Sequence, residues 1–596
     1  MGSKEAIRQG HHRLQRIHPP RPQEPWTYHH RGYAWSEKKD YDKAIADYNE
    51  TIRLDPKEAS AYRYRGLAWS EKKDYDKAIA DYITSIQLDP TEALAYQARG
   101  YAWSDKGEYD KAIADFNEAI RLDPTEALSY HARGYAWSEK EDHDNAIADY
   151  NEAIRLDPRE VTAYFHRGYS WSEKEDYDKA IKDFNKVIQL DPKDAWAYHH
   201  RGYAWSELKD KDKAIADYNE AIRLDPQEAS TYFSRAGVWS EKKVYDKAIA
   251  DYNEVIRLDP QDAWAYFKRA YAWSQKADHD KAIADYNEAI RLDPQIAWAF
   301  FNRGYAWSQK SDVDKAIADY NEAIHLDPKL ATAYFNRGIA WNEKEDYDKA
   351  IADFDEGIRL DPNEAVAYLN RGYALGQKND NDKAITDFNE AIRLAPNNAS
   401  AYLNRGYAWS LKKDHDAAIA DYNEAIRLNP QEASAHLRRG IAWTSKLDYD
   451  KAITDFNEAI RLEPNNALNY NHRGYAWSLQ KDYEKALADY DEAIRLDANV
   501  AFPYAYRAWL WATCPENELR DGKKAVESAT RACELNDWKY APDLEILAAA
   551  YAESGDFDKA VEWQEKACNL ITDEDAKKAA EERLKLYQER KPYRDE

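Results

Sequence analysis

The 596-residue chain is poor in the residues that support thiol chemistry, tight turns and membrane spans. It contains three cysteines, one methionine and 20 glycines. The cysteines make neither a disulfide framework nor a spaced metal set, so we interpret Cys514, Cys533 and Cys568 as reduced, partly buried thiols. So few turn residues leave little room for β-hairpins. No run of about eighteen apolar residues occurs, which argues against a membrane span.

The chain also lacks an excess of positive charge. Its formal net charge is -25, whereas nucleic-acid-binding proteins gain much of their affinity from a basic surface. We therefore expect no nucleic acid and no membrane as partner, and a protein or peptide partner that is neutral or basic. Residues 1–24 are locally basic, but no apolar run follows that could form a signal peptide. We expect this segment to be flexible and the protein to be cytoplasmic.

Recognisable catalytic motifs are missing as well. The sequence has no Walker-type loop, no GxSxG and no HExxH. The adjacent pairs His11-His12, His29-His30 and His199-His200 would point to different sides of a helix, which does not suit metal ligation. We expect no enzyme activity, no cofactor and no metal site.

Aromatic residues and a strict repeat dominate what is present. The chain has 21 tryptophans and 46 tyrosines, and an Arg-Gly pair recurs every 34 residues from Arg31-Gly32 through Arg65-Gly66 to Arg201-Gly202. Counting places from Pro25 as the first, each unit reads approximately AYxxRGYAWSEKxDYDKAIADYNEAIRLDP. A fixed period of this length indicates a repeat architecture.

The unit contains two helical patterns. Its fourth, eighth and eleventh places share one face of a helix that ends at the charged SEKKD segment. The next run, from Asp42 to Leu54, places Ala44, Tyr48 and Thr51 on one stripe, and Pro56 stops it. Small residues at the eighth and twentieth places would let the two antiparallel helices approach closely, with large aromatic side chains between them.

These features resemble the tetratricopeptide repeat, and the Tyr-x-x-Arg-Gly units resemble those of bacterial arrays. The resemblance covers residues 25–571. It implies an all-α, right-handed superhelical solenoid of antiparallel helix pairs, with about sixteen units.

The repeat pattern also divides the chain. We expect a basic N-terminal segment at 1–24, fourteen regular repeats at 25–500, an elongated variant repeat with an insertion at 501–540 and a last repeat at 541–571. Residues 572–596 should form a capping helix, since Thr572 and Asp575 resemble a capping box. Terminal units of a solenoid need such a cover.

The arginine at the seventh place departs from the family pattern, where an apolar residue is usual. An Asp recurs at the twenty-third place of all fourteen regular units. Because a largely buried guanidinium needs a partner, we expect structural ion pairs such as Arg31 with Asp47 and Arg65 with Asp81. Direct contact of these arginines with a ligand is the alternative.

A second stripe of the first helix carries tyrosine at the ninth place. The resemblance implies that this face lines a concave groove. Packing of the same side chains between adjacent units is the alternative, and both roles are compatible because tyrosine is amphipathic. The stripe includes Tyr33, Tyr101, Tyr135, Tyr169, Tyr203, Tyr271, Tyr305, Tyr373, Tyr407 and Tyr475.

The second, fifth and sixth places vary along the array, unlike the packing places. Phenylalanines accumulate at the fifth place in the middle units, and asparagines follow at the sixth, where an amide can both donate to and accept from a peptide backbone. We predict that the following residues bind a protein or extended peptide: Phe233, Trp264, Phe267, Tyr271, Trp298, Phe301, Asn302, Tyr305, Phe335, Asn336, Asn370 and Asn404.

The thirteenth place changes from acidic to neutral along the chain. Glu37 and Glu241 belong to the acidic part, and Gln275 and Leu411 to the later part. A solvated helix end would explain the charges equally well. Recognition of an acidic C-terminal tail would need clustered cations, which Lys268 and Arg438 alone do not supply.

The sequence therefore favours a non-catalytic scaffold that binds a protein or extended peptide in the concave groove. Two alternatives remain open: a structural protein that self-assembles, and a regulatory subunit of an enzyme complex. A further hypothesis is that the basic N-terminal segment, with Arg8, Arg13 and Arg16, lies against the acidic early units as an intramolecular plug.

Overall fold

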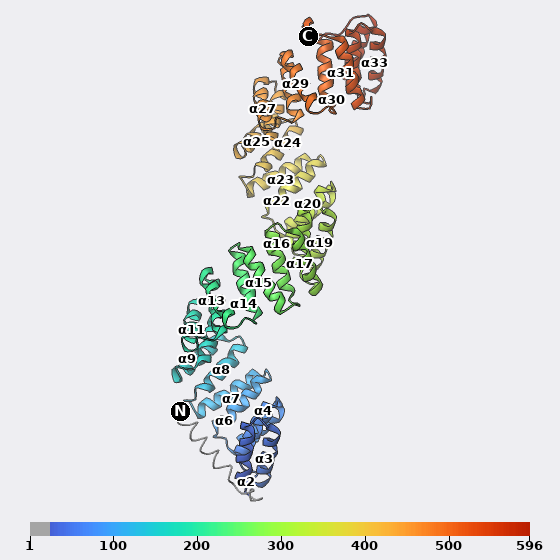
Figure 1. Cartoon of the computed structure of the whole chain (residues 1–596). Coiled ribbons are helices and arrows are strands. Elements are labelled where there is room, and N and C mark those ends of the chain that lie inside the picture. The colour runs from blue at the N-terminus through green and yellow to red at the C-terminus, as the bar shows by residue number, and fades with distance from the viewer. Residues whose placement is uncertain (1–23, 596) are drawn as a thin grey trace. The chain divides into compact units, whose positions relative to one another are not determined.

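The computed structural model describes residues 24–595, and within them it contains only helices. There are 33 α-helices and one short 3-10 helix, with no strand in this range. The chain divides into two compact halves, Met1–Pro294 and Gln295–Glu596. In each half the helices follow one another as pairs of a 13-residue first helix and a 14-residue second helix (Figure 1).

The N-terminal half holds eight regular units. Their first helices are α2 (Pro25–Glu37), α4 (Ala59–Glu71), α6 (Ala93–Asp105), α8 (Ala127–Glu139), α10 (Val161–Glu173), α12 (Ala195–Glu207), α14 (Ala229–Glu241) and α16 (Ala263–Gln275). Their second helices are α3 (Tyr41–Leu54), α5 (Tyr75–Leu88), α7 (Tyr109–Leu122), α9 (His143–Leu156), α11 (Tyr177–Leu190), α13 (Lys211–Leu224), α15 (Tyr245–Leu258) and α17 (His279–Leu292).

The C-terminal half holds six regular units and a closing region. The first helices are α18 (Ala297–Gln309), α20 (Ala331–Glu343), α22 (Ala365–Gln377), α24 (Ala399–Leu411), α26 (Ala433–Ser445) and α28 (Ala467–Leu479). The second helices are α19 (Val313–Leu326), α21 (Tyr347–Leu360), α23 (Asn381–Leu394), α25 (His415–Leu428), α27 (Tyr449–Leu462) and α29 (Tyr483–Leu496).

Local signals in the sequence set the ends of the helices. The side chain of Asp40 caps α3 by accepting a hydrogen bond from the backbone N–H of Lys43. At the other end, Asp55 is extended, as expected for a residue before proline, and Pro56 ends the helix. Between the paired helices Lys39 adopts a left-handed conformation with φ of 59°, which reverses the chain within three residues.

In twelve of the fourteen regular units the core forms where a glycine of the first helix meets a ring of the second, and Ala236 and Ala270 replace the glycine in the other two. In the first unit Tyr48 is fully buried, and a Cβ added to Gly32 would lie 2.9 Å from its ring. The glycine thus permits the close approach of the two helices. Ala44 is also fully buried on the same stripe of α3.

Consecutive units stack within each half. Each second helix packs against its own first helix and against the first helix of the next unit, as α3 does with α2 and α4. An ion pair between Lys72 and Asp42 joins the second unit to the first at the surface, and Lys106 pairs with Asp76 in the same way at 2.5 Å. A hydrophobic cluster around Tyr48 also includes Trp69 of the next unit, so the core is continuous between neighbours.

The closing region departs from the regular spacing. It consists of α30 (Ala501–Thr513), the 3-10 helix η1 (Asn517–Leu519), α31 (Gly522–Leu535), α32 (Ala541–Glu553), α33 (Phe557–Leu570) and α34 (Glu574–Gln588). The insertion between α30 and α31 contains η1 and is tied down by Arg520, which forms an ion pair with Glu553 of α32.

The last helix packs against α33 and buries Ala580 and Tyr587. The expectation of a capping box at Thr572 and Asp575 is wrong in its position. Asp573 is the N-cap residue, and its side chain accepts a hydrogen bond from the backbone N–H of Ala576 at 2.8 Å. Asp573 precedes Ala576 by three residues, the spacing at which an N-cap side chain accepts a hydrogen bond from the backbone. It therefore takes the capping role that the sequence pattern predicted for Thr572.

The expected all-α class of paired helices is confirmed. All three cysteines are free and buried, more fully than expected, and burial raises the pKa of the Cys533 thiol to about 12. The proposed plug formed by residues 1–24 lies outside the described residues, apart from Glu24.

Candidate functional site

The arginine at the seventh place is held by a fixed set of neighbours. Arg65 donates through Nε and Nη2 to both carboxylate oxygens of Asp81, at 2.8 and 2.5 Å. Its remaining Nη1 donates to the side-chain oxygen of Asn49, in the preceding unit, at 2.6 Å. Arg31 binds Asp47 with the same fork geometry, at 2.7 and 2.6 Å. This geometry suits a planar guanidinium, which a lysine would not replace.

Small exceptions show how this arrangement depends on the neighbouring residue. Arg99 keeps its bonds to Asp115, but the preceding unit offers Ile83 in place of the asparagine. Arg371 instead meets an aspartate, Asp355, at 2.5 Å. In both cases the arginine side chain is bonded within the fold.

The tyrosines at the ninth place form the exposed face of the first helices. Their exposed fractions lie between 36 and 45 %. A large aromatic side chain with this exposure has part of its ring available for contact. The exposed members are Tyr33, Tyr101, Tyr135, Tyr169, Tyr203, Tyr271, Tyr305, Tyr373, Tyr407 and Tyr475.

The ninth-place ring also contacts the sixth-place side chain of the following unit. Ring centroids lie 5.9 Å apart for Tyr33 and Tyr64, and 5.8 Å apart for Tyr169 and His200. The two roles considered for these tyrosines therefore coexist. One edge of the ring packs on the neighbouring unit, and the rest stays accessible.

One hollow on this face lies in the N-terminal half, between α12, α14 and α16. Sixth- and ninth-place residues line it, among them Tyr203, Gly237, Lys268 and Tyr271, together with Phe233 at the fifth place. Gly237 replaces the usual tyrosine, and a Cβ there would meet nothing within 4 Å. The thirteenth-place carboxylates of Glu207 and Glu241 also line this hollow. Its wall therefore combines aromatic rings with serine hydroxyls, two carboxylates and one lysine.

A second hollow lies in the C-terminal half, between α22, α23, α24 and α26. Its lining includes Tyr373, Asn404 and Tyr407, and the guanidinium of Arg438 lies 4.0 Å from the centre of the Tyr407 ring. Unit eleven departs from the repeat here, because Gly376 stands in place of serine and Asn381 in place of the usual tyrosine or histidine. These smaller side chains leave the space.

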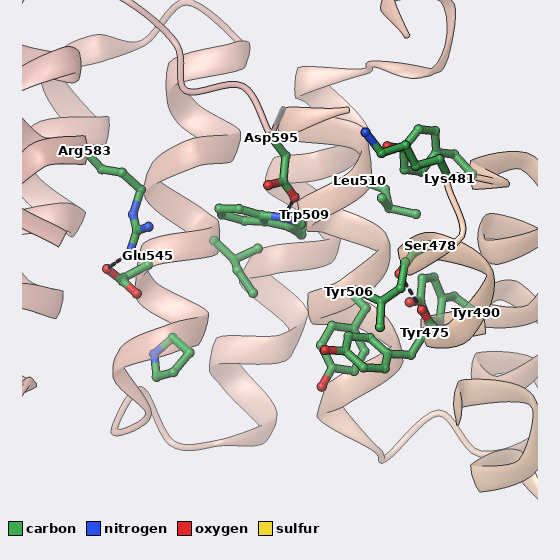
Figure 2. A pocket seen from close by; sticks show the side chains of 14 residues that line it. Tyr475, Ser478, Lys481, Tyr490, Tyr506, Trp509, Leu510, Glu545, Arg583 and Asp595 are labelled. Carbon is green, nitrogen blue, oxygen red and sulfur yellow. Dashed lines mark hydrogen bonds and ion pairs between the residues drawn. The ribbon is translucent and has the colours of Figure 1, made fainter. Parts of the chain in front are cut away.

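A third hollow, with a volume of about 520 Å³, lies where the regular array meets the closing region. Figure 2 shows Trp509 beneath Asp595 in the middle of the hollow, with Tyr475 and Tyr506 on one side of it and Arg583 and Glu545 on the other. The centroids of Tyr475 and Tyr506 are 5.3 Å apart. Arg583 and Glu545 form an ion pair of 2.6 Å along the margin. Ninth-place residues thus line all three hollows.

Histidines replace the usual residues at the fifth and sixth places of the early units. His131 Nε2 and His166 Nδ1 lie 2.9 Å apart and share a hydrogen bond between neighbouring units. Burial, with a smaller contribution from His131, lowers the pKa of His166 to about 4. Burial and the adjacent His199 lower the pKa of His200 to about 4. Both side chains are therefore neutral at neutral pH.

Residues 24–595 contain no group of three or more His, Cys, Asp or Glu side chains that could hold a metal ion. Within the same range, none of the helices has the length and apolar character that a membrane crossing requires.

Profiles of repeat families match the chain over most of its length. A profile described as "Tetratricopeptide repeat" matches residues 37–93, 369–433, 414–467 and 445–501. One described as "TPR repeat" matches 104–140, 134–170, 172–209, 241–276, 275–311 and 308–341. A third tetratricopeptide profile matches residues 195–228 and 331–364, and a fourth matches residues 545–573. The chain belongs to the tetratricopeptide repeat family.

Comparison with whole proteins finds more distant similarity to this tetratricopeptide chain. No curated protein matches the sequence. Among solved structures, yeast Tom70 is 21% identical, with 78% of this chain and 95% of that chain covered and a TM-score of 0.32. YrrB, described as a TPR protein with an unusual peptide-binding site, is 23% identical, with 30% of this chain and 92% of that chain covered and a TM-score of 0.28. The APC/C hetero-tetramer Cut9-Hcn1 is 15% identical, with 75% of this chain and 95% of that chain covered and a TM-score of 0.37.

The phenylalanines at the fifth place of the tetratricopeptide units lie deeper than expected. Phe267 and Phe335 are only 7 and 6 % exposed, which corrects the expectation that they are presented to a ligand. The ring of Phe267 packs on Tyr286 of the second helix, and that of Phe301 packs on Tyr320, each at 5.9 Å. The fifth place faces the partner helix because it lies one helical turn from the small eighth place. Phe233 and Phe301 are half-buried.

Tryptophans at the second place are exposed instead. Trp264 and Trp298 are 48 and 46 % exposed, and each lies edge-on to the phenylalanine three residues later. They cover the rings at the fifth place from solvent. The outer member of each aromatic pair, and not the phenylalanine, is therefore available for contact.

The asparagines at the sixth place are half-buried, and three of them bond to their own helix. The side-chain nitrogens of Asn302, Asn336 and Asn370 donate to the carbonyl oxygen four residues earlier, at 2.7, 2.8 and 2.8 Å. Each amide uses one of its two donors in this way, so an acceptor and a second donor remain in its inventory. Asn404 lies in the second hollow.

Several residues of this face are not predicted by the repeat pattern. Gly376 and Asn381 open the second hollow, and Tyr506 and Trp509 line the third. A comparison of each unit with the consensus would have marked Gly376, since it breaks the Ser pattern at the twelfth place. Nothing local in the sequence marks Asp595 as a neighbour of Trp509, 86 residues away.

Proposed function

We propose that this protein is a non-catalytic scaffold that binds a protein or extended peptide along the sixth, ninth and thirteenth places of its first helices. The observation that carries the proposal is that the same places line three separate hollows, two of them within the C-terminal half. A surface that repeats every unit suits an extended ligand, because such a ligand meets successive units in turn. Membership of the tetratricopeptide family supports a role in protein interaction.

The chemistry of the face supports contacts of two kinds. Exposed tyrosines and the tryptophans Trp264 and Trp298 offer large apolar surfaces at low cost in side-chain entropy. The amides of Asn336, Asn370 and Asn404 offer hydrogen bonds to a peptide backbone of any sequence. The ligand is therefore held by its side chains on the rings and by its main chain on the amides.

Charge would favour different ligand segments in the two halves. Glu207 and Glu241 line the hollow of the N-terminal half, which suits a neutral or basic segment. In the C-terminal half Arg438 stacks on Tyr407, and the neighbouring thirteenth-place residues are Gln377 and Leu411. That hollow suits a neutral segment with an acceptor group facing the arginine.

Affinity capture from native lysate, followed by mass spectrometry, tests the proposal. The bait is the full chain, and the variant carries Tyr373→Ala, Asn404→Ala and Tyr407→Ala in the second hollow. We expect at least one protein to be captured by the parent chain and lost from the variant. The control is Leu447→Ala, which removes an apolar side chain that is 71 % exposed at a turn. Equal capture by all three chains would remove this face as the binding site.

A further inference from the structure

The segment after α34 returns to the first helix of the fifteenth unit. Residues 591–595 form no helix or strand, and the backbone N–H of Asp595 donates to the carbonyl oxygen of Thr513 at 3.0 Å. The indole Nε1 of Trp509 donates to the carboxylate of Asp595 at 2.9 Å, as Figure 2 shows. Trp509 and Thr513 occupy the ninth and thirteenth places of their unit.

Two more side chains of the segment take part in this contact. The ring of Tyr593 packs on Trp509 with a centroid distance of 5.7 Å. Arg594 forms an ion pair of 2.6 Å with Glu553 of α32. The guanidinium of Arg583 also lies over the ring of Tyr593, 5.7 Å from the ring centre. The segment thus makes aromatic, ionic and main-chain contacts over three consecutive residues.

These contacts fall on the places where the regular units are open. The ten ninth-place tyrosines of the regular units are 36–45 % exposed, whereas Trp509 is half-buried and contacts the ring of Tyr593 and the carboxylate of Asp595. The third hollow lies directly beside this contact, since Trp509 and Asp595 both line it. The segment therefore lies on the fifteenth unit's part of the same face.

We propose that residues 593–595 are an intramolecular ligand of the face formed by the sixth, ninth and thirteenth places at α30, and that the surface around Trp509 takes an extended peptide with an aromatic residue followed two positions later by a carboxylate. This inference rests on the proposed function, because it takes the sixth, ninth and thirteenth places to be the ligand-binding face. The occupant is this segment of the chain itself. A ligand that reaches the fifteenth unit must displace it.

The energetics suit a displaceable occupant. The contact consists of a few hydrogen bonds, one partly exposed ion pair and one ring pair, each of which adds modestly to stability. The segment is covalently tethered to α34, which ends at Gln588, so its effective concentration at Trp509 is in the millimolar range. A weak contact is therefore occupied in the intact chain, and an external peptide has to compete with it.

Binding of a fluorescently labelled synthetic peptide, QERKPYRD (residues 588–595), to the full chain tests this proposal. The variant Tyr593→Ala, Asp595→Ala keeps the chain length but removes the two side chains that contact Trp509. We expect it to bind the peptide about tenfold more tightly than the parent chain, because the tethered competitor is weakened. Lys591→Ala is the matched control, since Lys591 pairs only with Glu589 at the surface, and we expect parent-like binding.

A second substitution places the peptide on the proposed surface. Trp509→Phe, added to Tyr593→Ala, Asp595→Ala, keeps a ring but removes the indole N–H. We expect about a tenfold loss of peptide affinity at an unchanged thermal unfolding midpoint. Equal peptide binding by the parent and the double variant, or binding that ignores Trp509→Phe, would overturn the proposal.

The outcome is separable from that of the proposed function. Peptide binding at Trp509 is read directly and does not depend on capturing a partner at Tyr373, Asn404 and Tyr407. Failure of the peptide experiment leaves the capture result standing. Failure of capture, with peptide binding as expected, would confine the binding role to the fifteenth unit.

Discussion

The regular units and the closing region use the same places of the first helix in different ways. In a regular unit the seventh-place arginine binds a buried aspartate, and the ninth-place tyrosine is open. In the fifteenth unit Arg507 donates to the hydroxyl of Ser528 and pairs with the exposed Asp491, and the ninth-place Trp509 is covered by Tyr593 and Asp595. The end of the array thus replaces an internal ion pair with weaker bonds, and an open face with an internal contact.

The arginine substitution should show the largest difference between the two regions. Arg235→Met leaves Asp251, whose side chain is 8 % exposed, without its partner, and we expect a loss of about 3–4 kcal/mol in local stability. Arg507→Met leaves only a serine and an exposed aspartate, and we expect a loss of about 1 kcal/mol. Hydrogen exchange of the helix pairs α14–α15 and α30–α31 measures both. Equal losses would contradict the distinction drawn between the two sites.

Two glycines, Gly522 in the closing region and Gly440 in a regular unit, differ in what a larger side chain would meet. A Cβ at Gly522 would overlap the backbone of Glu553 and Ser554, which cannot move as a side chain does. A Cβ at Gly440 would lie 2.6 Å from the ring of Phe456, which can shift.

We therefore expect Gly522→Ala to cost about 2–3 kcal/mol and Gly440→Ala about 1 kcal/mol. Denaturant-dependent hydrogen exchange of α31 and α27 provides the measurement. A tolerated alanine at Gly522, with a costly one at Gly440, would reverse the expected order.

Titration distinguishes the sixth place in the two regions. Burial lowers the pKa of His166 to about 4, below the ordinary 6.5 of an unfolded chain. The unfolded state therefore takes up a proton first, so stability is complete above pH 6.5 and declines as the pH falls toward 4. After allowance for partial exposure, the loss is about 1–2 kcal/mol.

The substitution His166→Asn should remove this part of the pH dependence, which unfolding measured at pH 7, 5.5 and 4.5 would show. Tyr506→Asn changes the sixth place of the fifteenth unit, where burial raises the pKa of the tyrosine, so its effect should not vary over this range. An unchanged pH slope in His166→Asn would contradict the account of the early units.

The smallest expected effect concerns unit eleven, a regular unit with a glycine at the twelfth place. A Cβ at Gly376 of α22 would meet nothing within 4 Å. Gly376→Ala should therefore stabilise the helix by about 0.5–1 kcal/mol, because alanine loses less backbone entropy on folding. Hydrogen exchange of α22 measures the gain. A loss of stability would mean that the hollow beside Gly376 is filled more tightly than its lining indicates.

Most of the regular array could be predicted from the sequence, because its period and its helix signals are local. The second helix expected from Asp42 to Leu54 is observed at Tyr41–Leu54, with Ala44, Tyr48 and Thr51 buried as one stripe. The seventh-place arginine and the twenty-third-place aspartate are 16 residues apart in every regular unit. The paired hydrogen bonds of Arg65 with Asp81 therefore follow from one repeated spacing.

The depth of the fifth place could not be predicted in the same way. Phe267 and Trp264 lie one turn apart on one helix, and only the position of Tyr286 on the partner helix decides which of them is covered. The contact between Trp509 and Asp595 depends on a chain reversal after α34. Neither feature has a periodic signal, because each depends on how separate elements meet.

The central claim, that the ninth-place face holds the ligand, is tested most directly by site-specific photocrosslinking in native lysate. A benzophenone amino acid replaces Tyr373 in one full chain and Leu447 in another, since both side chains are exposed but only Tyr373 lies on the proposed face. The account predicts that the captured protein crosslinks at position 373 and not at 447. Crosslinking at 447 alone, or equally at both positions, would contradict it.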